Sequence, residues 1–341
     1  MKNANYDKQS RELWLDTAKG IGIILVVLGH LCGGYLPLLV KWIFSFHMPL
    51  FFVLSGYLEY GKKIASFKQY FKHKAGSLLW PYFTFGLCIV IIAAVDSIRV
   101  GNPTILYRTI LIHLFGYSRV DYGIGVIWFL AVLFELEILS GFIRFKNLLY
   151  ALIIFLIVGN IAFFKQITLP LYLNIVGGAI AFFMIGMIIN YLHERVKDVS
   201  ALMLLAILFI LGAISIYTLT NNDKVDLAVG MYGGSLIFYY IGAISGSFVV
   251  ILISLIICKF TTVNVFAFLG QETLIIMMAH FFVNRFLNLG FGLMSINLNS
   301  KFNGIGSIIQ SMICIGICYG ISLIVKKYTP WIIRFPVKVN S

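Results

Sequence analysis

The sequence predicts an all-α fold, a polytopic integral membrane bundle of about ten transmembrane helices, and two observations carry this prediction. Of the 341 residues, 60% are hydrophobic and only 11% are charged, and the mean hydropathy is +0.96. Soluble domains carry roughly 25% charged residues, so this chain has too few charges to cover a surface that faces water. Apolar stretches long enough to cross a hydrocarbon core of roughly 30 Å also recur along the whole chain.

The apolar stretches are continuous runs, which favours helices over a β-barrel, because the strands of a barrel alternate in polarity. The stretch 104–117 is apolar but short and contains Arg108 and His113, so we expect it to lie at the membrane interface. We find no internal repeat and no soluble region, and we expect residues 1–341 to form a single transmembrane domain. The predicted spans are 17–36, 40–59, 78–96, 123–142, 147–164, 171–191, 201–220, 233–257, 265–288 and 304–325.

The connecting loops predict the orientation in the membrane. With the N-terminus in the cytoplasm, 18 of the 26 Lys and Arg residues fall on the inside and 8 on the outside. This asymmetry obeys the positive-inside rule and places both termini in the cytoplasm. The net charge of +13 is therefore interpreted as membrane topology, and we expect membrane lipids rather than nucleic acid as partners.

The first predicted span contains polar residues at membrane depth, where an ionisable group is costly and usually faces a cavity or a partner. Lys19 and His30 are eleven residues apart, so they lie on one helix face and are separated by ~16 Å along the axis. A line of polar groups on this face suggests a path through the protein. Two simpler alternatives remain open: Lys19 could extend to the lipid headgroups, and Asp16 could cap the first helix.

The second predicted span brings another histidine to a similar depth. Consecutive antiparallel spans with a short connection tend to pack together, so His47 could meet His30. Ser55 lies farther inward on the same span. A lone imidazole inside the membrane could instead only hydrogen-bond to a neighbouring helix. Composition and spacing thus indicate a polar cavity and do not name a reaction.

We expect no metal site. The five cysteines lie in or at the ends of apolar spans, which is typical of small buried thiols. Cys314 and Cys318 share a helix face, but neither a histidine nor a second cysteine pair stands nearby in the sequence.

An ordered set of short motifs resembles the acyltransferase-3 family, in its fucose-4-O-acetylase-like branch. The first part of the resemblance consists of WLDTAKGIGIILVVLGH and FSFHMPLFFVLSGYL. It continues with WPYFTFG at 80–86, WFLAVLFELE at 128–137, GGAIAFFMIG at 177–186 and LGQETLIIMMAH at 269–280. The set covers most of the chain in the expected order.

The resemblance implies a membrane O-acyltransferase of the bacterial inner membrane. Members move an acyl group, usually acetyl from cytoplasmic acetyl-CoA, to a hydroxyl of a surface carbohydrate or lipid-linked glycan. The acyl-CoA is then a co-substrate, and no permanently bound cofactor is expected. The family's basic residues match Lys19, Lys72 and Lys74, which would bind the phosphates of acetyl-CoA. Arginine is common at these places in the family, and lysine keeps the charge but binds phosphate as a point charge.

The resemblance also implies roles at the reaction centre. His30 would be a general base toward the acceptor hydroxyl or a nucleophile that carries the acyl group, with His47 beside it. Supporting roles fall to the polar residues Asp16 and Ser55 and, later in the chain, to Trp128, Glu137, Glu272 and His280. For Trp128, an anchor at the membrane interface is an equal alternative to stacking on a sugar.

Two other functional classes remain open at this point. A polysaccharide exporter or transporter without acyl-transfer chemistry would tolerate loss of the basic cytoplasmic residues, whereas an acyltransferase would need them together with His30. A membrane sensor or binding module would normally carry an attached soluble domain, which we do not find.

Overall fold

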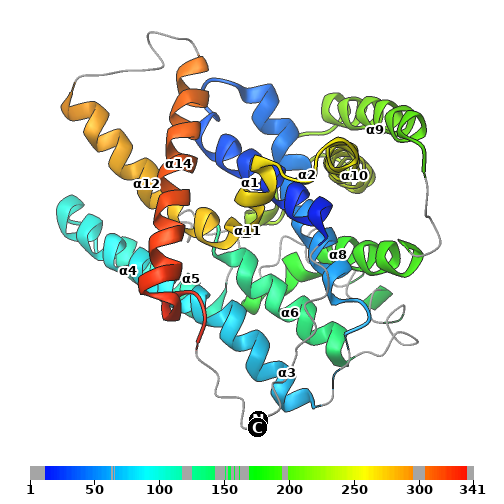
Figure 1. Ribbon diagram of the computed structural model, residues 1–341. Coiled ribbons are helices and arrows are strands. Elements are labelled where there is room, and N and C mark those ends of the chain that lie inside the picture. The colour runs from blue at the N-terminus through cyan, green and yellow to red at the C-terminus, as the bar shows by residue number, and fades with distance from the viewer. Residues whose placement is uncertain are drawn as a thin grey trace.

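The structure is a computed structural model that describes residues 12–62, 64, 66–116, 125–142, 150, 153–154, 157, 161, 169–193, 199–294 and 304–335. It is almost entirely helical (Figure 1). The α-helices are α1 (Leu13–Leu31), α2 (Pro37–Glu59), α3 (Phe67–Lys74), α4 (Trp80–Val100), α5 (Thr104–Phe115), α6 (Trp128–Phe142), α8 (Leu173–His193), α9 (Ala201–Asn221), α10 (Leu236–Phe260), α11 (Val265–Gln271), α12 (Thr273–Leu293) and α14 (Ile305–Tyr328).

Short elements connect some of these helices. A π-helical turn, Ala75–Leu79, joins α3 to α4, and single 3-10 turns lie at Pro170–Tyr172, Leu227–Val229 and Pro330–Ile332. In the loop between α9 and α10, β1 (Val225–Asp226) pairs antiparallel with β2 (Met231–Tyr232), with Val225 opposite Tyr232.

The prediction of an all-α polytopic membrane bundle is confirmed. Among the described residues, eight helical stretches are long and apolar enough to cross a membrane. They are Leu13–Leu31, Pro37–Glu59, Phe67–Val100, Pro170–Leu192, Ala201–Asn221, Leu236–Phe260, Thr273–Leu293 and Ile305–Tyr328. The predicted span 147–164 lies almost wholly outside the described residues.

Three predicted spans differ from the observed helices. The span predicted at 265–288 is two helices, because α11 ends at Gln271 and α12 begins at Thr273. The span predicted at 78–96 is the second part of one helical stretch that starts at Phe67 and continues through the π-helical turn. Helix α6 has only 15 residues, a length of ~22 Å, so the span predicted at 123–142 is shorter than expected.

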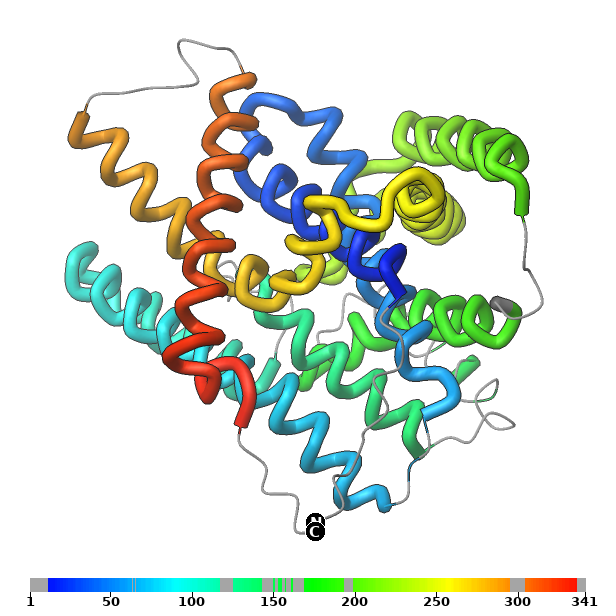
Figure 2. The backbone as a smooth tube through the Cα atoms, viewed as in Figure 1, coloured from blue at the N-terminus to red at the C-terminus, as the bar shows by residue number. Residues whose placement is uncertain are grey.

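Helix α2 lies at the centre of the bundle and packs against α1, α8 and α10 (Figures 1 and 2). Its side chains Phe46, Leu50 and Phe52 are fully buried. By contrast, α9 at the edge of the bundle leaves Leu202 and Phe209 78% and 81% exposed. Apolar side chains this exposed on a helix of spanning length are expected to face lipid.

Glycines allow the closest helix contacts, as expected where small residues let backbones approach in a membrane. A Cβ atom on Gly186 of α8 would overlap the Val53 carbonyl oxygen of α2, and one on Gly56 of α2 would overlap the Phe183 carbonyl oxygen of α8. The same relation joins α1 to α11, where Gly20 faces the backbone of Phe266. These crossings fix α1 and α8 against their neighbours at backbone distance.

Replacing Gly186 by valine should destabilise the bundle, because the added side chain must push α8 away from α2. We expect a loss of about 1–3 kcal/mol or more, as for other overpacked cores. Gly316→Val on α14 is the matched control, since a Cβ atom there meets nothing within 4 Å. The check is thermal unfolding of the detergent-solubilised protein, followed by size-exclusion chromatography. Equal midpoints for the two variants would contradict the α2–α8 contact.

Candidate functional site

Three histidines from three different helices meet inside the bundle. His30 lies in the last turn of α1, His47 in α2 and His280 in α12. The ring centroids of His30 and His47 are 6.4 Å apart, and those of His30 and His280 are 5.4 Å apart. His47 and His280 are buried, while His30 between them is half-buried. The sequence-based prediction that His30 and His47 could meet agrees with this arrangement, which also adds His280.

Backbone contacts orient two of the three rings. Nδ1 of His47 lies 2.8 Å from the carbonyl oxygen of Ile43, and Nδ1 of His280 lies 3.2 Å from that of Ile276. Because a carbonyl oxygen can only accept a hydrogen bond, each Nδ1 must carry the proton. In the neutral rings, Nε2 is then the free acceptor, and Nε2 of His280 is buried without a hydrogen-bond partner in the described structure. In the neutral ring of His280, Nε2 is therefore an open proton-accepting nitrogen.

Two aromatic rings form the walls around His30. The Phe44 ring lies 5.5 Å from His30 and 4.9 Å from His47 between centroids, and the Phe281 ring lies 5.0 Å from His30 and 4.6 Å from His280. Gly125, just before α6, lies against Phe281. These contacts keep the imidazoles in a largely apolar setting, in which electrostatic interactions are stronger than in water.

A lysine from the loop between α9 and α10, directly before β1, approaches the same walls. Lys224 Nζ lies 5.7 Å from the centroid of the Phe44 ring, a cation–π distance. On the same loop, burial raises the pKa of the Asp226 carboxyl, and the charge of Lys224 opposes this rise. The loop thus places a positive charge beside the aromatic wall of the histidine cluster.

The helix face between Lys19 and His30 is packed rather than open. Ile23, Val26 and Val27 occupy it, and all three are 0% exposed. Lys19 itself is half-buried in the second turn of the helix. In this structure, therefore, α1 does not provide an open path along the face that was expected to be polar.

Asp16 does not cap the first helix, so that alternative is wrong. Helix α1 begins at Leu13 with Glu12 at the N-cap, and Asp16 is buried inside the first turns. Its Oδ2 accepts a hydrogen bond of 3.4 Å from Gln271 Nε2 at the end of α11. Asp16 therefore contacts the break between α11 and α12 rather than the histidines.

A second polar cluster lies where α2, α3 and α6 meet. Lys74 is buried, and its Nζ lies 2.6 Å from Glu59 Oε2 and 2.7 Å from Glu137 Oε2. The Tyr70 hydroxyl lies 2.7 Å from Glu59 Oε1, and Lys62 forms a partly exposed ion pair with Glu59. Lys74 was predicted to bind phosphate, and Glu137 to support the reaction. In this structure the two residues bind each other.

The remaining predicted residues lie apart from both clusters or at their edges. Lys72 is exposed on α3, and Ser55 is half-buried on α2. Glu272 forms an ion pair of 2.6 Å with Lys326 of α14, and it precedes His280 by eight residues, or ~12 Å along α12. Trp128 is buried at the start of α6, its ring packing edge-on against Phe129, so it does not stand at the membrane interface as an exposed anchor.

Sequence reasoning missed Phe44, Phe281 and Lys224 as contributors to these clusters. The two phenylalanines belong to a chain with 30 of them, so their type alone gives no signal. Their positions in the sequence do give a signal, because Phe44 stands one helical turn before His47 and Phe281 follows His280 directly. In the described part of the chain, no group of three or more His, Cys, Asp or Glu side chains is arranged to hold a metal ion.

Comparison with known proteins adds the family context. A family model with the description "acyltransferase domain" matches residues 12–327. Over 82 residues, the chain is 42% identical to the nodulation protein NolL of Mesorhizobium japonicum and to that of Sinorhizobium fredii. These alignments cover 21% of this chain, and the chain spans only 22% of the length of either relative. No solved structure matches the chain at a significant level.

Lys74→Met should destabilise the protein strongly, because it leaves Glu137 buried without its cation and Glu59 with only the partly exposed Lys62. Removing one partner of a buried ion pair typically costs about 3–5 kcal/mol. The matched control is Lys72→Met on the same helix, where an exposed substitution should change stability by less than about 0.5 kcal/mol. Denaturant unfolding in detergent compares the two. A Lys74→Met variant as stable as Lys72→Met would show that the buried ion pair does not form.

Proposed function

The chain belongs to the acyltransferase-3 family, and from this premise we propose that it moves an acetyl group from cytoplasmic acetyl-CoA to a hydroxyl of a surface or exported polysaccharide. The family and the multi-pass helices make it a membrane acyltransferase. The acetyl donor and the carbohydrate acceptor are the proposed part. The single observation that carries the proposal is the cluster of His30, His47 and His280.

The proposed reaction uses the open nitrogen of an imidazole as a general base. His30 accepts the proton of the acceptor hydroxyl while the hydroxyl oxygen attacks the carbonyl carbon of the thioester. The new C–O bond forms, the C–S bond breaks, and the proton passes to the departing CoA thiolate. Such catalysis contributes roughly 10²–10⁴-fold. A covalent acyl-histidine at His30 is the alternative route to the same products.

His47 and His280 would act as positioning residues in this scheme. Their Nδ1–H groups are held by the carbonyls of Ile43 and Ile276, so their Nε2 atoms are available for a hydrogen bond to His30 or to the substrate. A neighbour that accepts a hydrogen bond fixes which nitrogen of His30 carries a proton. The two rings would thereby keep one nitrogen of His30 free for the acceptor.

The proposed donor site lies near α3. Lys72 is exposed and is free to meet the phosphates of acetyl-CoA as a point charge, and Lys19 would contribute from the first turns of α1. For Lys74 to bind a phosphate, the phosphate would have to replace Glu59 or Glu137 as its partner. We therefore assign the leading role in phosphate binding to Lys72.

The proposed location is the bacterial inner membrane, with both termini in the cytoplasm. The excess of Lys and Arg in the inner loops supports this orientation, which places Lys72 on the side where acetyl-CoA is made. The two relatives are bacterial proteins named for nodulation, but they match over too short a stretch to name an acceptor.

His30→Ala should remove O-acetyl groups from the surface glycan without changing the amount of protein, because the substitution deletes the base and leaves a half-buried position. NMR of purified glycan from wild-type, deletion and His30→Ala strains measures the acetyl content and its sugar position. His73→Ala, on the surface of α3, is the control histidine variant and should retain wild-type acetylation.

Two outcomes would contradict the proposal. Normal acetyl content in the His30→Ala strain would remove the catalytic role of His30. A deletion strain that lacks the glycan itself at the cell surface, while its intracellular glycan is acetylated normally, would instead indicate an exporter.

A further inference from the structure

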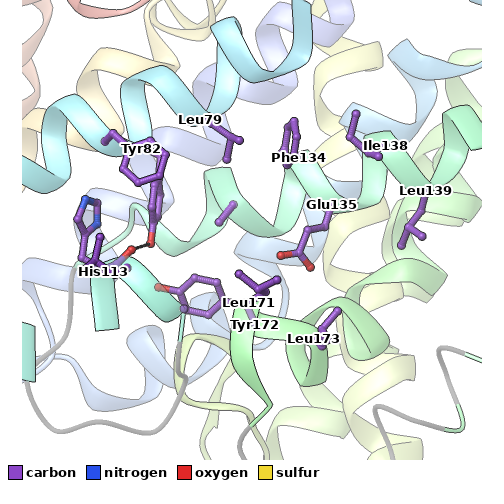
Figure 3. A pocket seen from close by; sticks show the side chains of 14 residues that line it. Leu79, Tyr82, His113, Phe134, Glu135, Ile138, Leu139, Leu171, Tyr172 and Leu173 are labelled. Atoms are coloured by element: carbon purple, nitrogen blue, oxygen red, sulfur yellow. Dashed lines mark hydrogen bonds between the residues drawn. The ribbon is translucent and has the colours of Figure 1, made fainter. Parts of the chain in front are cut away.

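A cavity of about 380 Å³ lies between α4, α5, α6 and the start of α8, and neither the histidine cluster nor the cluster around Lys74 forms part of it (Figure 3). Ligand pockets in proteins typically measure roughly 300–1,000 Å³, so the volume suits a small ligand or part of a larger one. Aliphatic and aromatic side chains such as Leu79, Phe134, Ile138 and Leu173 form most of its lining. The cavity is therefore suited to an apolar group.

The cavity opens on an apolar surface of the bundle, which is expected to face lipid. Phe83, Leu114 and Leu171 line it and are 48%, 57% and 56% exposed. Phe83 and Leu171 belong to helical stretches of membrane-spanning length, and Leu114 belongs to the short apolar helix α5. A molecule dissolved in the bilayer can therefore reach the cavity from the side, without passing through water.

Three polar side chains in this apolar lining each have a buried atom without a hydrogen-bond partner in the described structure: Glu135 Oε2, His113 Nδ1 and the hydroxyl of Tyr172. Glu135 extends from α6 toward the segment that carries Leu171 and Tyr172 (Figure 3), and its Oε2 is buried without a hydrogen-bond partner in the described structure. The same holds for Nδ1 of His113, whose ring stacks on Tyr82 with centroids 4.8 Å apart. A buried polar atom left unpaired costs about 1–3 kcal/mol, which a ligand that donates a hydrogen bond would offset.

The wall opposite Glu135 is held in an unusual backbone conformation. Leu171 and Tyr172 have φ values of 56° and 55°, in the left-handed region that residues other than glycine rarely adopt. Tyr172 N donates to the Gly116 carbonyl oxygen at 2.8 Å, which ties this wall to the end of α5. Such conformations cost about 1–3 kcal/mol each and cluster at ligand sites.

We propose that this cavity binds an amphiphilic lipid, with its apolar chain against α6 and a hydroxyl or amide donor of its head bonded to Glu135. The apolar lining and the opening toward lipid favour the acyl chain of the lipid. The unpartnered carboxyl oxygen of Glu135 favours a hydrogen-bond donor in its head group. The site goes beyond the proposed acyl transfer, and lipid binding there requires no transfer chemistry.

The test uses the full chain in nanodiscs of phosphatidylethanolamine and phosphatidylglycerol, with two photoreactive probes. One is a monoacylglycerol with a diazirine in its chain, which carries hydroxyl donors. The other is the methyl ester of the same fatty acid, which carries none. Mass spectrometry of peptides from α6 locates the crosslinks. We expect the monoacylglycerol to label 131–139 about fivefold more than the ester, the preference that one buried hydrogen bond of average strength confers.

Two variants distinguish the hydrogen bond to Glu135 from the space that the cavity provides. Glu135→Leu should make the two probes label equally. Ala131→Phe should suppress labelling by both probes, because Ala131 lines the cavity and the added ring fills it. Ala206→Phe on the exposed face of α9 is the matched control and should leave labelling unchanged.

Two results would overturn the proposal even if a variant failed to fold. One is equal labelling of 131–139 by the two probes in the wild-type protein. The other is displacement of the monoacylglycerol by acetyl-CoA, which would assign the cavity to the pantetheine arm of the donor. The crosslinks are read without any acyl transfer, so loss of the proposed function would not affect them.

Discussion

The close approach of α1 to α11 and α2 is the constraint on which the rest of the site depends. Gly20 lets the backbone of α1 meet that of α11 at Phe266, and Gly29 lets its other end lie against Ile43 and Phe44 of α2. Because α11 ends at Gln271, α12 starts in a new direction from beside α1. His280, about two turns into α12, thereby lies next to His30.

The carboxylates that pair with lysines and the imidazoles occupy different levels of the bundle. Glu59 lies twelve residues beyond His47, or ~18 Å along α2, and it shares Lys74 with Glu137. Glu272 likewise has Lys326 as its partner. Carboxylates whose charge is balanced by a lysine can connect helices inside a membrane protein. The histidines, by contrast, lie among aromatic rings. Ion pairs thus connect the helices at one level of the bundle. At another level, the imidazoles of the three histidines lie next to one another.

The sequence was sufficient for the fold class and for the meeting of His30 with His47, because both follow from apolar length and from the packing of consecutive antiparallel helices. It was insufficient where partners are distant in the chain. Nothing local to Lys74 indicates that Glu137, 63 positions later, forms an ion pair with it. Helical spacing placed Lys19 and His30 on one face correctly, but it could not show that Ile23, Val26 and Val27 fill the space between them.

The most direct test of the histidine cluster is ¹⁵N NMR of histidine-labelled protein in lipid, on a background in which His73, His113 and His193 are replaced by asparagine. The hydrogen bonds to Ile43 and Ile276 predict that His47 and His280 each carry a proton on Nδ1. Spectra with the proton of either ring on Nε2 and an unprotonated Nδ1 would contradict the arrangement from which the proposed acyl transfer is derived.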